Sequence, residues 1–216
     1  MKSILLIGMG RFGHHLCENL VRHGNEVMVV DQSEAQVQDL LQVATSVRIG
    51  DCTKEEVLRA LGVRNFDMCI VCIGTNFQSS LEITNLLKEL GAKYVVSKAS
   101  RSIQAKFLEK VGADEVVFPD RDVAEKLSVR YSENHIFDYF QLSNDYSVYE
   151  VPPLPSWIGK SIAQSNVRFH HHVNIVGVKR EGNFKMVPTA DYVFDKDDHL
   201  LILGTKENVQ KLMKHY

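Results

Sequence analysis

ILLIGMGRFG, residues 4–13, is an apolar run that leads directly into a glycine-rich turn. The apolar residues predict a buried strand, and the pattern that follows predicts an amphipathic helix. Gly8 permits a tight turn, Gly10 lets a pyrophosphate approach the backbone, and Gly13 lets the helix pack on the strand. The free N–H groups and the dipole at the start of the helix attract phosphate. The stretch therefore predicts a site for the phosphates of a nucleotide.

An acidic residue completes this nucleotide-binding pattern. Asp31 ends the next apolar run, residues 27–30, and its carboxylate can accept hydrogen bonds from the hydroxyl groups of a ribose. Its charge would repel the 2′-phosphate of NADP, and no arginine follows at position 32. NAD, ATP, ADP and AMP all carry an adenosine ribose, so Asp31 leaves the choice among them open.

Length and composition are those of a globular protein with one or two domains. The 216 residues are 44 % hydrophobic and 24 % charged, and the formal net charge of -2 favours no nucleic-acid partner. No apolar stretch approaches the roughly 20 residues that span a bilayer, and we expect no signal peptide before the first strand. We therefore expect a cytoplasmic protein.

Strand and helix patterns alternate through about the first 120 residues. Six continuous apolar runs predict strands of a parallel sheet that is covered on both faces. These strands are expected at Ser3–Ile7, Glu26–Val30, Ser46–Ile49, Met68–Ile73, Tyr94–Lys98 and Glu115–Phe118. The helices between them are expected at Phe12–His23, Glu34–Leu41, Lys54–Leu61, Phe77–Leu90 and Ser102–Val111. The alternation predicts a doubly wound, Rossmann-like α/β sheet.

The pattern changes after residue 120, where a further helix is expected over 122–130. Shorter strands and turns follow, among them a hairpin formed by 173–179 and 184–187. We predict a nucleotide-binding domain over 1–120, a crossover helix and linker over 121–143, and a small α+β domain over 144–216.

Further ligand-binding residues are expected beyond the carboxyl ends of the strands, where doubly wound sheets bind their ligands. Asp51 is placed to meet an adenine edge. Thr75 and Asn76 either contact the ligand or cap the next helix. Lys98 meets a phosphate or ribose or lies at a solvated strand end, and Arg11 pairs with a terminal phosphate or is a solvated surface residue. The complete expected set is Gly8, Met9, Gly10, Arg11, Phe12, Gly13, Asp31, Gln32, Asp51, Cys52, Gly74, Thr75, Asn76 and Lys98.

Residues with metal-binding or redox chemistry occur elsewhere in the chain. Asp120 either holds a divalent cation or, as we favour from spacing alone, caps a helix. Three adjacent histidines at 170–172 rarely reach one ion, so we expect a solvated loop. Cys69 and Cys72 lie in an apolar run and on opposite faces of a strand, so we expect buried reduced thiols. No nucleophile, base and orienting group occur together.

Nine short strings along the chain form a recognisable set. They are IGMGRFG (7–13), VD (30–31), GD (50–51), CIGTN (72–76), GAD (112–114), IGKS (158–161), NVR (166–168), IVGV (175–178) and DHLLILG (198–204). The set resembles KTN/RCK domains, the regulators of potassium conductance, which combine a TrkA-N with a TrkA-C part. It is most similar to the single-unit cytosolic subunits of Ktr/Trk potassium uptake systems.

The resemblance implies a regulatory protein and not an enzyme. In that family, subunits dimerise and assemble into an octameric ring, which docks on the cytoplasmic face of a potassium-translocating integral membrane subunit. ATP and ADP favour different ring shapes and so change gating. The cofactor that we expect is therefore ATP or ADP, with NAD(H) and AMP as alternatives.

The resemblance also implies roles for single residues. Arg11 matches the arginine that reaches the terminal phosphate of ATP, and Asp31 matches the ribose ligand. Asp120 falls where Ktr-type subunits carry a longer glutamate that helps to bind a divalent cation, Mg or Ca, across the dimer. Arg168 and Asn174 fall near the pocket in which some relatives bind cyclic di-AMP.

Two other functions stay open. A small NAD-dependent oxidoreductase would share the glycine-rich fingerprint, although the second domain offers no recognisable proton donor for a nicotinamide. A ligand-sensing subunit for another membrane partner would share every feature of the pocket.

Overall fold

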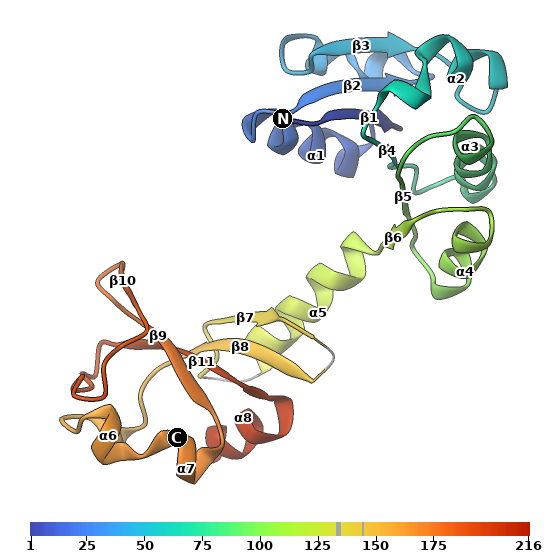
Figure 1. Cartoon of the computed structure of the whole chain (residues 1–216). Helices are drawn as coiled ribbons and strands as arrows, with labels where there is room; N and C mark the ends of the chain where they lie inside the picture. Colours follow the sequence, from blue (N-terminus) through green and yellow to red (C-terminus); the bar gives the residue numbers. More distant parts are fainter. Residues whose placement is uncertain (133–134, 144) are drawn as a thin grey trace. The chain divides into compact units, whose positions relative to one another are not determined.

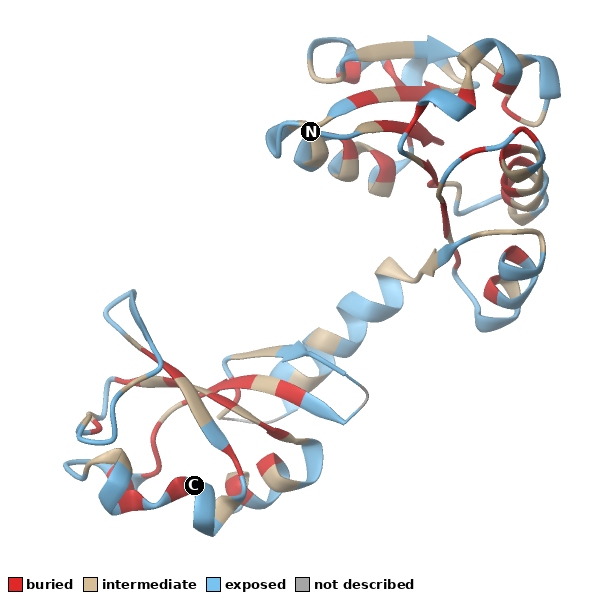
Figure 2. Cartoon of the chain, viewed as in Figure 1, coloured by how far each residue is buried: buried red, intermediate tan, exposed pale blue. Residues whose placement is uncertain are grey.

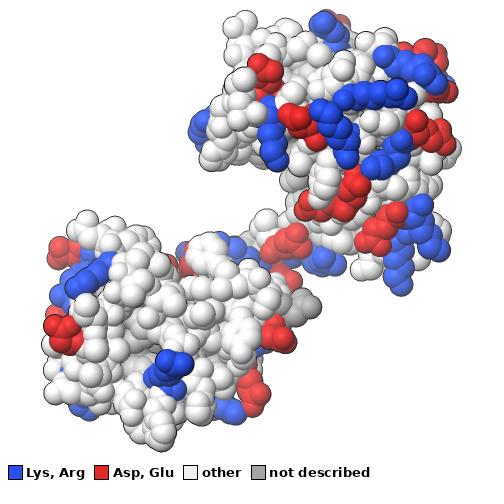
Figure 3. All heavy atoms as spheres, viewed as in Figure 1, with Lys and Arg blue, Asp and Glu red and all other residues white. Residues whose placement is uncertain are grey.

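The structure is a computed structural model that describes residues 1–132, 135–143 and 145–216. The chain forms two compact units, Met1–Arg121 and Asp122–Tyr216, and each unit has its own sheet (Figure 1). No helix of the described residues is long and apolar enough to cross a membrane. Acidic and basic side chains are interspersed on the visible face of each unit (Figure 3), in keeping with the small net charge.

The N-terminal unit is built on a six-stranded parallel sheet in the order β3-β2-β1-β4-β5-β6. Its strands are β1 (Ser3–Ile7), β2 (Glu26–Asp31), β3 (Ser46–Ile49), β4 (Met68–Val71), β5 (Val95–Lys98) and β6 (Glu115–Val117). Strand β1 pairs with β2 on one side and with β4 on the other, so the strand order reverses here. The predicted doubly wound sheet is confirmed, and its switch point lies beside the glycine-rich turn.

Four α-helices connect these strands, and one predicted helix is replaced by tighter turns. The helices are α1 (Arg11–Arg22), α2 (Glu55–Leu61), α3 (Phe77–Glu89) and α4 (Ser102–Lys110). The prediction of an α-helix over Glu34–Leu41 is wrong, since the segment forms the 3-10 turns η1 (Glu34–Gln36) and η2 (Gln38–Gln42). Its buried side chains, Val37 and Leu40, belong to the hydrophobic core of the N-terminal unit.

The core of this unit lies on both faces of the sheet. In β1, Leu5 and Ile7 pack into one buried cluster, whereas Ile4 and Leu6 pack into the other. A strand covered on both faces needs apolar residues at every position, which explains the continuous run at residues 4–7. Buried residues accordingly follow the strands and the helix faces turned toward them (Figure 2).

The four cysteines belong to this core. All are free and buried, and Cys69 and Cys72 lie in the clusters on opposite faces of the sheet. Burial raises the pKa of both thiols to about 12, so neither forms a reactive thiolate near neutral pH. The structure thus agrees with the predicted buried reduced thiols.

The C-terminal unit is an antiparallel sheet with short helices. Helix α5 (Pro119–Ser132) carries the chain into it, and none of the described residues of α5 is buried. The strand order is β10-β9-β11-β8-β7. The strands are β7 (Asp138–Gln141), β8 (Tyr146–Val151), β9 (Asn174–Arg180), β10 (Asn183–Met186) and β11 (His199–Thr205), and the helical segments are η4 (Pro155–Trp157), α6 (Ile162–Ser165), α7 (Val167–His171) and α8 (Lys206–Met213). The predicted hairpin is present as β9 and β10.

The histidine run is largely exposed, as expected, with His170 and His172 exposed and His171 half-buried, but it ends a helix and is not a loop. His170 and His171 end helix α7, and His172 is its C-cap with a positive φ of 54°. The His171 ring packs against Trp157 and His215, and burial together with the neighbouring histidines lowers its pKa. Within the described residues, no group of three or more His, Cys, Asp or Glu side chains is arranged to hold a metal ion.

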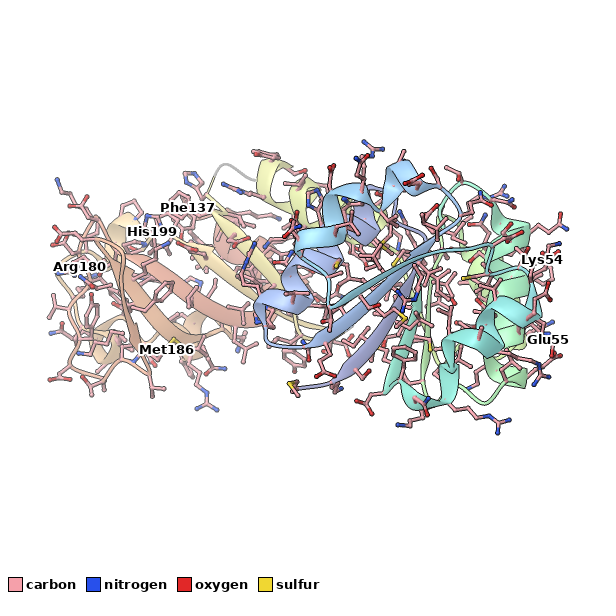
Figure 4. The ribbon with its side chains drawn as sticks, turned by 90° about the horizontal axis from the view of Figure 1, so that it is seen from above. Lys54, Glu55, Phe137, Arg180, Met186 and His199 are labelled. Carbon is pink, nitrogen blue, oxygen red and sulfur yellow. The ribbon has the colours of Figure 1, made fainter. Side chains whose placement is uncertain are left out.

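Two buried carboxylates of the C-terminal unit are fully engaged by its own residues. Asp198 is 0 % exposed and accepts hydrogen bonds from Arg180 Nε (2.6 Å), the Tyr192 hydroxyl (3.0 Å) and the Asp195 N–H (2.8 Å). Glu150 pairs with Lys179 and with His199, whose ring stacks on Phe137 (Figure 4). These contacts satisfy charges that burial would otherwise penalise.

Candidate nucleotide-binding site

A pocket of about 490 Å³ lies beyond the carboxyl ends of β1 to β5 in the N-terminal unit. This volume falls in the range of about 300–1,000 Å³ that is common for small-molecule sites. All of the predicted nucleotide-binding residues line the pocket except Met9 and Gly13. The sheet thus brings together predicted residues that lie up to 90 positions apart in the sequence, from Gly8 to Lys98.

The three glycines of the turn differ in what their missing side chains permit. Gly8 has φ of +91°, and a Cβ there would lie 2.7 Å from Cγ1 of Ile73. A Cβ on Gly13 would lie 2.4 Å from the carbonyl oxygen of Gly8, so Gly13 lets α1 pack against the turn. A Cβ on Gly10 would have no atom within 4 Å, so the space before the start of α1 is open. Gly13 therefore serves the fold, whereas Gly10 opens the pocket.

The first turn of α1 presents backbone donors to that open space. Gly10 is the N-cap residue and its position offers no side-chain cap, so the N–H groups of the first turn remain available. The Met9 side chain is fully buried, which leaves its backbone as the part nearest to the pocket. Arg11 begins the helix, and its exposed guanidinium makes no ion pair with any residue that the structure describes.

Asp31 ties the end of β2 to the glycine-rich turn. Its Oδ2 accepts a hydrogen bond from the Met9 N–H at 2.7 Å, and its Oδ1 accepts one from the Ser33 N–H at 2.9 Å. Each carboxylate oxygen can accept two hydrogen bonds, so both keep a free lone pair. Asp31 can therefore hold the turn in place and still accept from two ribose hydroxyls.

Asp51 and Cys52 form the wall after β3. Oδ1 of Asp51 accepts hydrogen bonds from the hydroxyl group (2.7 Å) and the N–H (3.0 Å) of Thr53. The hydrogen bonds from Thr53 lower the pKa of Asp51, which keeps this carboxylate an acceptor at neutral pH. Burial raises the pKa of Cys52 to about 12, so its thiol is an apolar neighbour.

The turn after β4 contributes a helix cap as well as pocket surface. Oδ1 of Asn76 accepts a hydrogen bond from the Ser79 N–H at 3.2 Å, which makes Asn76 the N-cap of α3. The predicted capping alternative is therefore confirmed for Asn76, although the residue also lines the pocket. Thr75 is exposed beside it.

The side chain of Lys98, at the end of β5, reaches into the pocket between Phe12 of α1 and the turn at Gly74. Its side chain is 12 % exposed, and its Nζ lies 5.3 Å from the centre of the Phe12 ring. The same Nζ lies 3.4 Å from Oδ2 of Asp120. Of the two alternatives left open for Lys98, the solvated strand end does not apply, because the side chain turns inward over the Gly74 turn.

Asp120 lies inside the first turn of α5 and does not cap it. The helix begins at Pro119, whose fixed φ and missing N–H suit the first helical position. The favoured capping prediction is thus wrong. The predicted second-site residues Arg168 (α7) and Asn174 (β9) are both exposed.

Some lining residues had no signal in the sequence. Gln36, in the 3-10 turn η1, lines the pocket, and its carbonyl oxygen lies 2.7 Å from Nε2 of His14. Ser33, Thr53 and Ser79 also line the pocket. These residues belong to connections whose path across the strand ends depends on tertiary packing.

These features define a class. A parallel sheet whose switch point carries a glycine-rich turn, an acidic residue after the second strand and a pocket between them is a Rossmann-type nucleotide-binding domain. Here a small α+β unit follows it. A TrkA-N domain model matches residues 4–119, and a TrkA-C domain model matches residues 147–215. The chain belongs to this family of TrkA-N/TrkA-C proteins, as the sequence resemblance predicted.

Individual relatives agree with this assignment. Ktr system potassium uptake protein C of Bacillus subtilis (strain 168) is 36 % identical over 213 residues, 99 % of this chain and 96 % of that protein. The structure of the GsuK channel bound to NAD has a TM-score of 0.70 at 20 % identity, over 99 % of this chain and 39 % of the other. GsuK bound to ADP has a TM-score of 0.54 at 20 % identity, over 62 % of this chain and 36 % of the other. This chain spans less than half of those two chains, and their likeness to it shows the fold alone.

Proposed function

We propose that this chain is the nucleotide-sensing regulatory subunit of a potassium uptake system. The observation that carries the proposal is the open space before α1, flanked by the exposed Arg11 and by Asp31. The near full-length match to a protein named for Ktr potassium uptake supports the physiological role. In this proposal the protein is cytoplasmic and associates with the membrane through a potassium-translocating integral subunit.

The ligand that we propose is an adenine nucleotide, ADP or ATP first, with NAD(H) or AMP as alternatives. The ribose hydroxyls bind Asp31, the adenine amino group donates to Asp51, and the phosphates meet the N–H groups of α1. Arg11 then lies beside the last phosphate, where its guanidinium adds charge-assisted hydrogen bonds. A ligand shifts a conformational equilibrium only through unequal affinity for two states, and an extra phosphate supplies such a difference.

Assembly and further ligands belong to the same proposal. The subunits form homodimers that assemble into an octameric ring, as the family resemblance implies. Asp120 offers a single carboxylate, so a Mg or Ca ion there would also need oxygens from the phosphates or a second subunit. Cyclic di-AMP would bind the C-terminal unit near Arg168 and Asn174, whose exposed side chains are accessible to it.

Ligand release and calorimetry test the nucleotide site. Mass spectrometry of the heat-released ligand should find an adenine nucleotide, and titration should give binding of ADP and ATP. Asp31→Ala should weaken both by about tenfold or more, since it removes charge-assisted hydrogen bonds to the ribose. Asp39→Ala, which removes an exposed carboxylate outside the pocket, is the matched control. Unchanged affinity of the Asp31 variant would contradict the proposed ribose site.

Potassium flux tests the regulatory role. The potassium-translocating subunit from the same genome, reconstituted in vesicles, should change its flux when this protein is added, and the change should depend on the nucleotide. A potassium flux that is the same with and without this protein, whichever nucleotide is present, would contradict the proposal. The competing oxidoreductase predicts turnover of NAD(H) with a substrate panel, and robust turnover would overturn a purely regulatory role.

A further inference from the structure

Lys98 is a pocket residue whose charged group also contacts the helix that leaves the N-terminal unit. Its ammonium lies in the pocket between Phe12 of α1 and the Gly74 turn. Asp120, its partner at 3.4 Å, belongs to the first turn of α5. A single ammonium group thus lies between the phosphate end of the pocket and the start of α5.

The two partners of this ion pair are solvated very differently. The Lys98 side chain is 12 % exposed, whereas the Asp120 side chain is 81 % exposed. An ammonium that has lost most of its water needs a strong anionic partner. A carboxylate that is largely in water provides a weak one, because solvent screens the attraction. The ammonium is therefore available to a better anion within its reach.

The phosphates of a bound nucleotide are such an anion. They carry more than one negative charge, and they would lie at the N-terminus of α1, the helix that Phe12 belongs to. A lysine acts on phosphate as a flexible point charge, so Lys98 can turn toward the phosphates without a rearrangement of β5. Asp120 then loses its partner, and the charge balance at the start of α5 changes.

We propose that Lys98 exchanges partners: it pairs with Asp120 in the empty pocket and with the nucleotide phosphates in the filled one. Through this exchange, occupancy of the pocket acts on the first turn of α5. The inference rests on the proposed nucleotide site and adds the residue pair through which binding is transmitted.

Calorimetry on four proteins tests the exchange: the wild type, Asp120→Asn, Lys98→Gln and the double variant. The titrations use ADP in EDTA, which removes any divalent cation from Asp120. Asp120→Asn should tighten ADP binding about threefold, because it removes a screened competitor for the ammonium. Lys98→Gln should weaken binding about tenfold, because it removes a charge-assisted contact. In the Lys98→Gln background, Asp120→Asn should have no effect.

Comparing the effect of Asp120→Asn in the wild type and in Lys98→Gln separates partner exchange from simple charge repulsion. If Asp120→Asn tightens ADP binding equally in both backgrounds, Asp120 acts as a distant charge and the exchange is overturned. Weaker binding of Asp120→Asn in EDTA would overturn it as well. Lys93→Gln is the matched control, since Lys93 pairs with Asp67 at 3.3 Å outside the pocket. Lys98→Met, which keeps the apolar stem, replaces Lys98→Gln if that variant does not fold.

Hydrogen exchange measured on the wild type needs no variant. A carboxylate released from Lys98 at the start of α5 favours the positive end of the helix dipole. ADP should therefore slow amide exchange in the second turn of α5, whose N–H groups bond back to the first turn, and Lys98→Gln should show the slower rate without ADP. Unchanged exchange on saturation with ADP would overturn transmission to α5 and leave the nucleotide site standing. Absence of any ADP or ATP binding to the wild type would overturn both proposals.

Discussion

Asp198 and Asp31 show how the two units use a carboxylate differently. Asp198 is entirely buried, and three neighbours of the same unit donate hydrogen bonds to it. Asp31 is half-buried, accepts from two backbone N–H groups and keeps acceptor capacity toward an open pocket. The cations differ in the same way, since Arg180 is bound to Asp198 whereas Arg11 stands exposed. A polar group whose hydrogen bonds are all made within the fold stabilises the fold. A polar group with unused donors or acceptors is available to bind a ligand.

The largest effect should come from breaking the satisfied network. Asp198→Ala leaves Arg180, the Tyr192 hydroxyl and the Asp195 N–H without their shared acceptor, and should lower the free energy of unfolding of the C-terminal unit by about 3 kcal/mol. Fluorescence of Trp157, the single tryptophan, reports this unit because its ring lies in the C-terminal core. Asp197→Ala, which removes the exposed neighbouring carboxylate, should leave the unfolding midpoint unchanged. Equal effects of both variants would contradict a structural role that is particular to Asp198.

The next effect should separate two glycines of one turn. Gly13→Ala places a Cβ against the Gly8 carbonyl and should destabilise the N-terminal unit by about 1–3 kcal/mol. All four cysteines are buried in that unit, so the rate of thiol labelling in denaturant measures its stability. Gly10→Ala has open space around the new Cβ and should keep thiol protection while it weakens nucleotide binding. Similar loss of thiol protection in both variants would contradict this division of roles.

A smaller effect should distinguish ATP from ADP. Arg11→Ala should lower the affinity for ATP about tenfold and that for ADP about twofold, because a charge-assisted contact to the last phosphate is lost. Calorimetry measures both affinities. Arg22→Ala removes an exposed arginine from the last turn of the same helix and serves as the control. Equal losses for the two nucleotides would reject the contact with the terminal phosphate.

The smallest effect should appear on acidification. Burial alone would raise the pKa of Asp198, but hydrogen bonds from Arg180, the Asp195 N–H and Tyr192 outweigh it and lower the pKa below its usual value. A carboxyl group with a lowered pKa in the folded state stabilises the fold above the unfolded pKa of about 3.9. That stability is lost as the pH falls through the folded pKa. Trp157 fluorescence should therefore show weakening of the C-terminal unit below about pH 4, and Asp198→Asn should flatten this dependence. An unchanged slope in the variant would contradict the assignment.

The sequence was sufficient for the features that depend on local pattern. Continuous apolar runs predicted the parallel strands, and the glycine-rich turn with the strand ends predicted 12 of the 22 residues that line the pocket, because parallel strands all present their carboxyl ends at one edge. The features that it missed depend on distant contacts. Nothing local pairs Arg180 with Asp198 or turns Lys98 toward Asp120. The helix predicted over Glu34–Leu41 is present only as two short 3-10 segments, which the local pattern could not distinguish, because apolar side chains three residues apart suit both kinds of helix.

The strand order also has a consequence for synthesis of the protein. Strand β1 is made first, yet it is central, and its second neighbour β4 begins only at Met68. At about 5–20 residues per second, the ribosome needs roughly 3–12 s to supply that neighbour. For this time one edge of β1, rich in apolar side chains, stays unpaired and is a target for chaperones or for aggregation. The glycine-rich turn is likewise complete long before Lys98 exists, so the nucleotide site is finished late in translation.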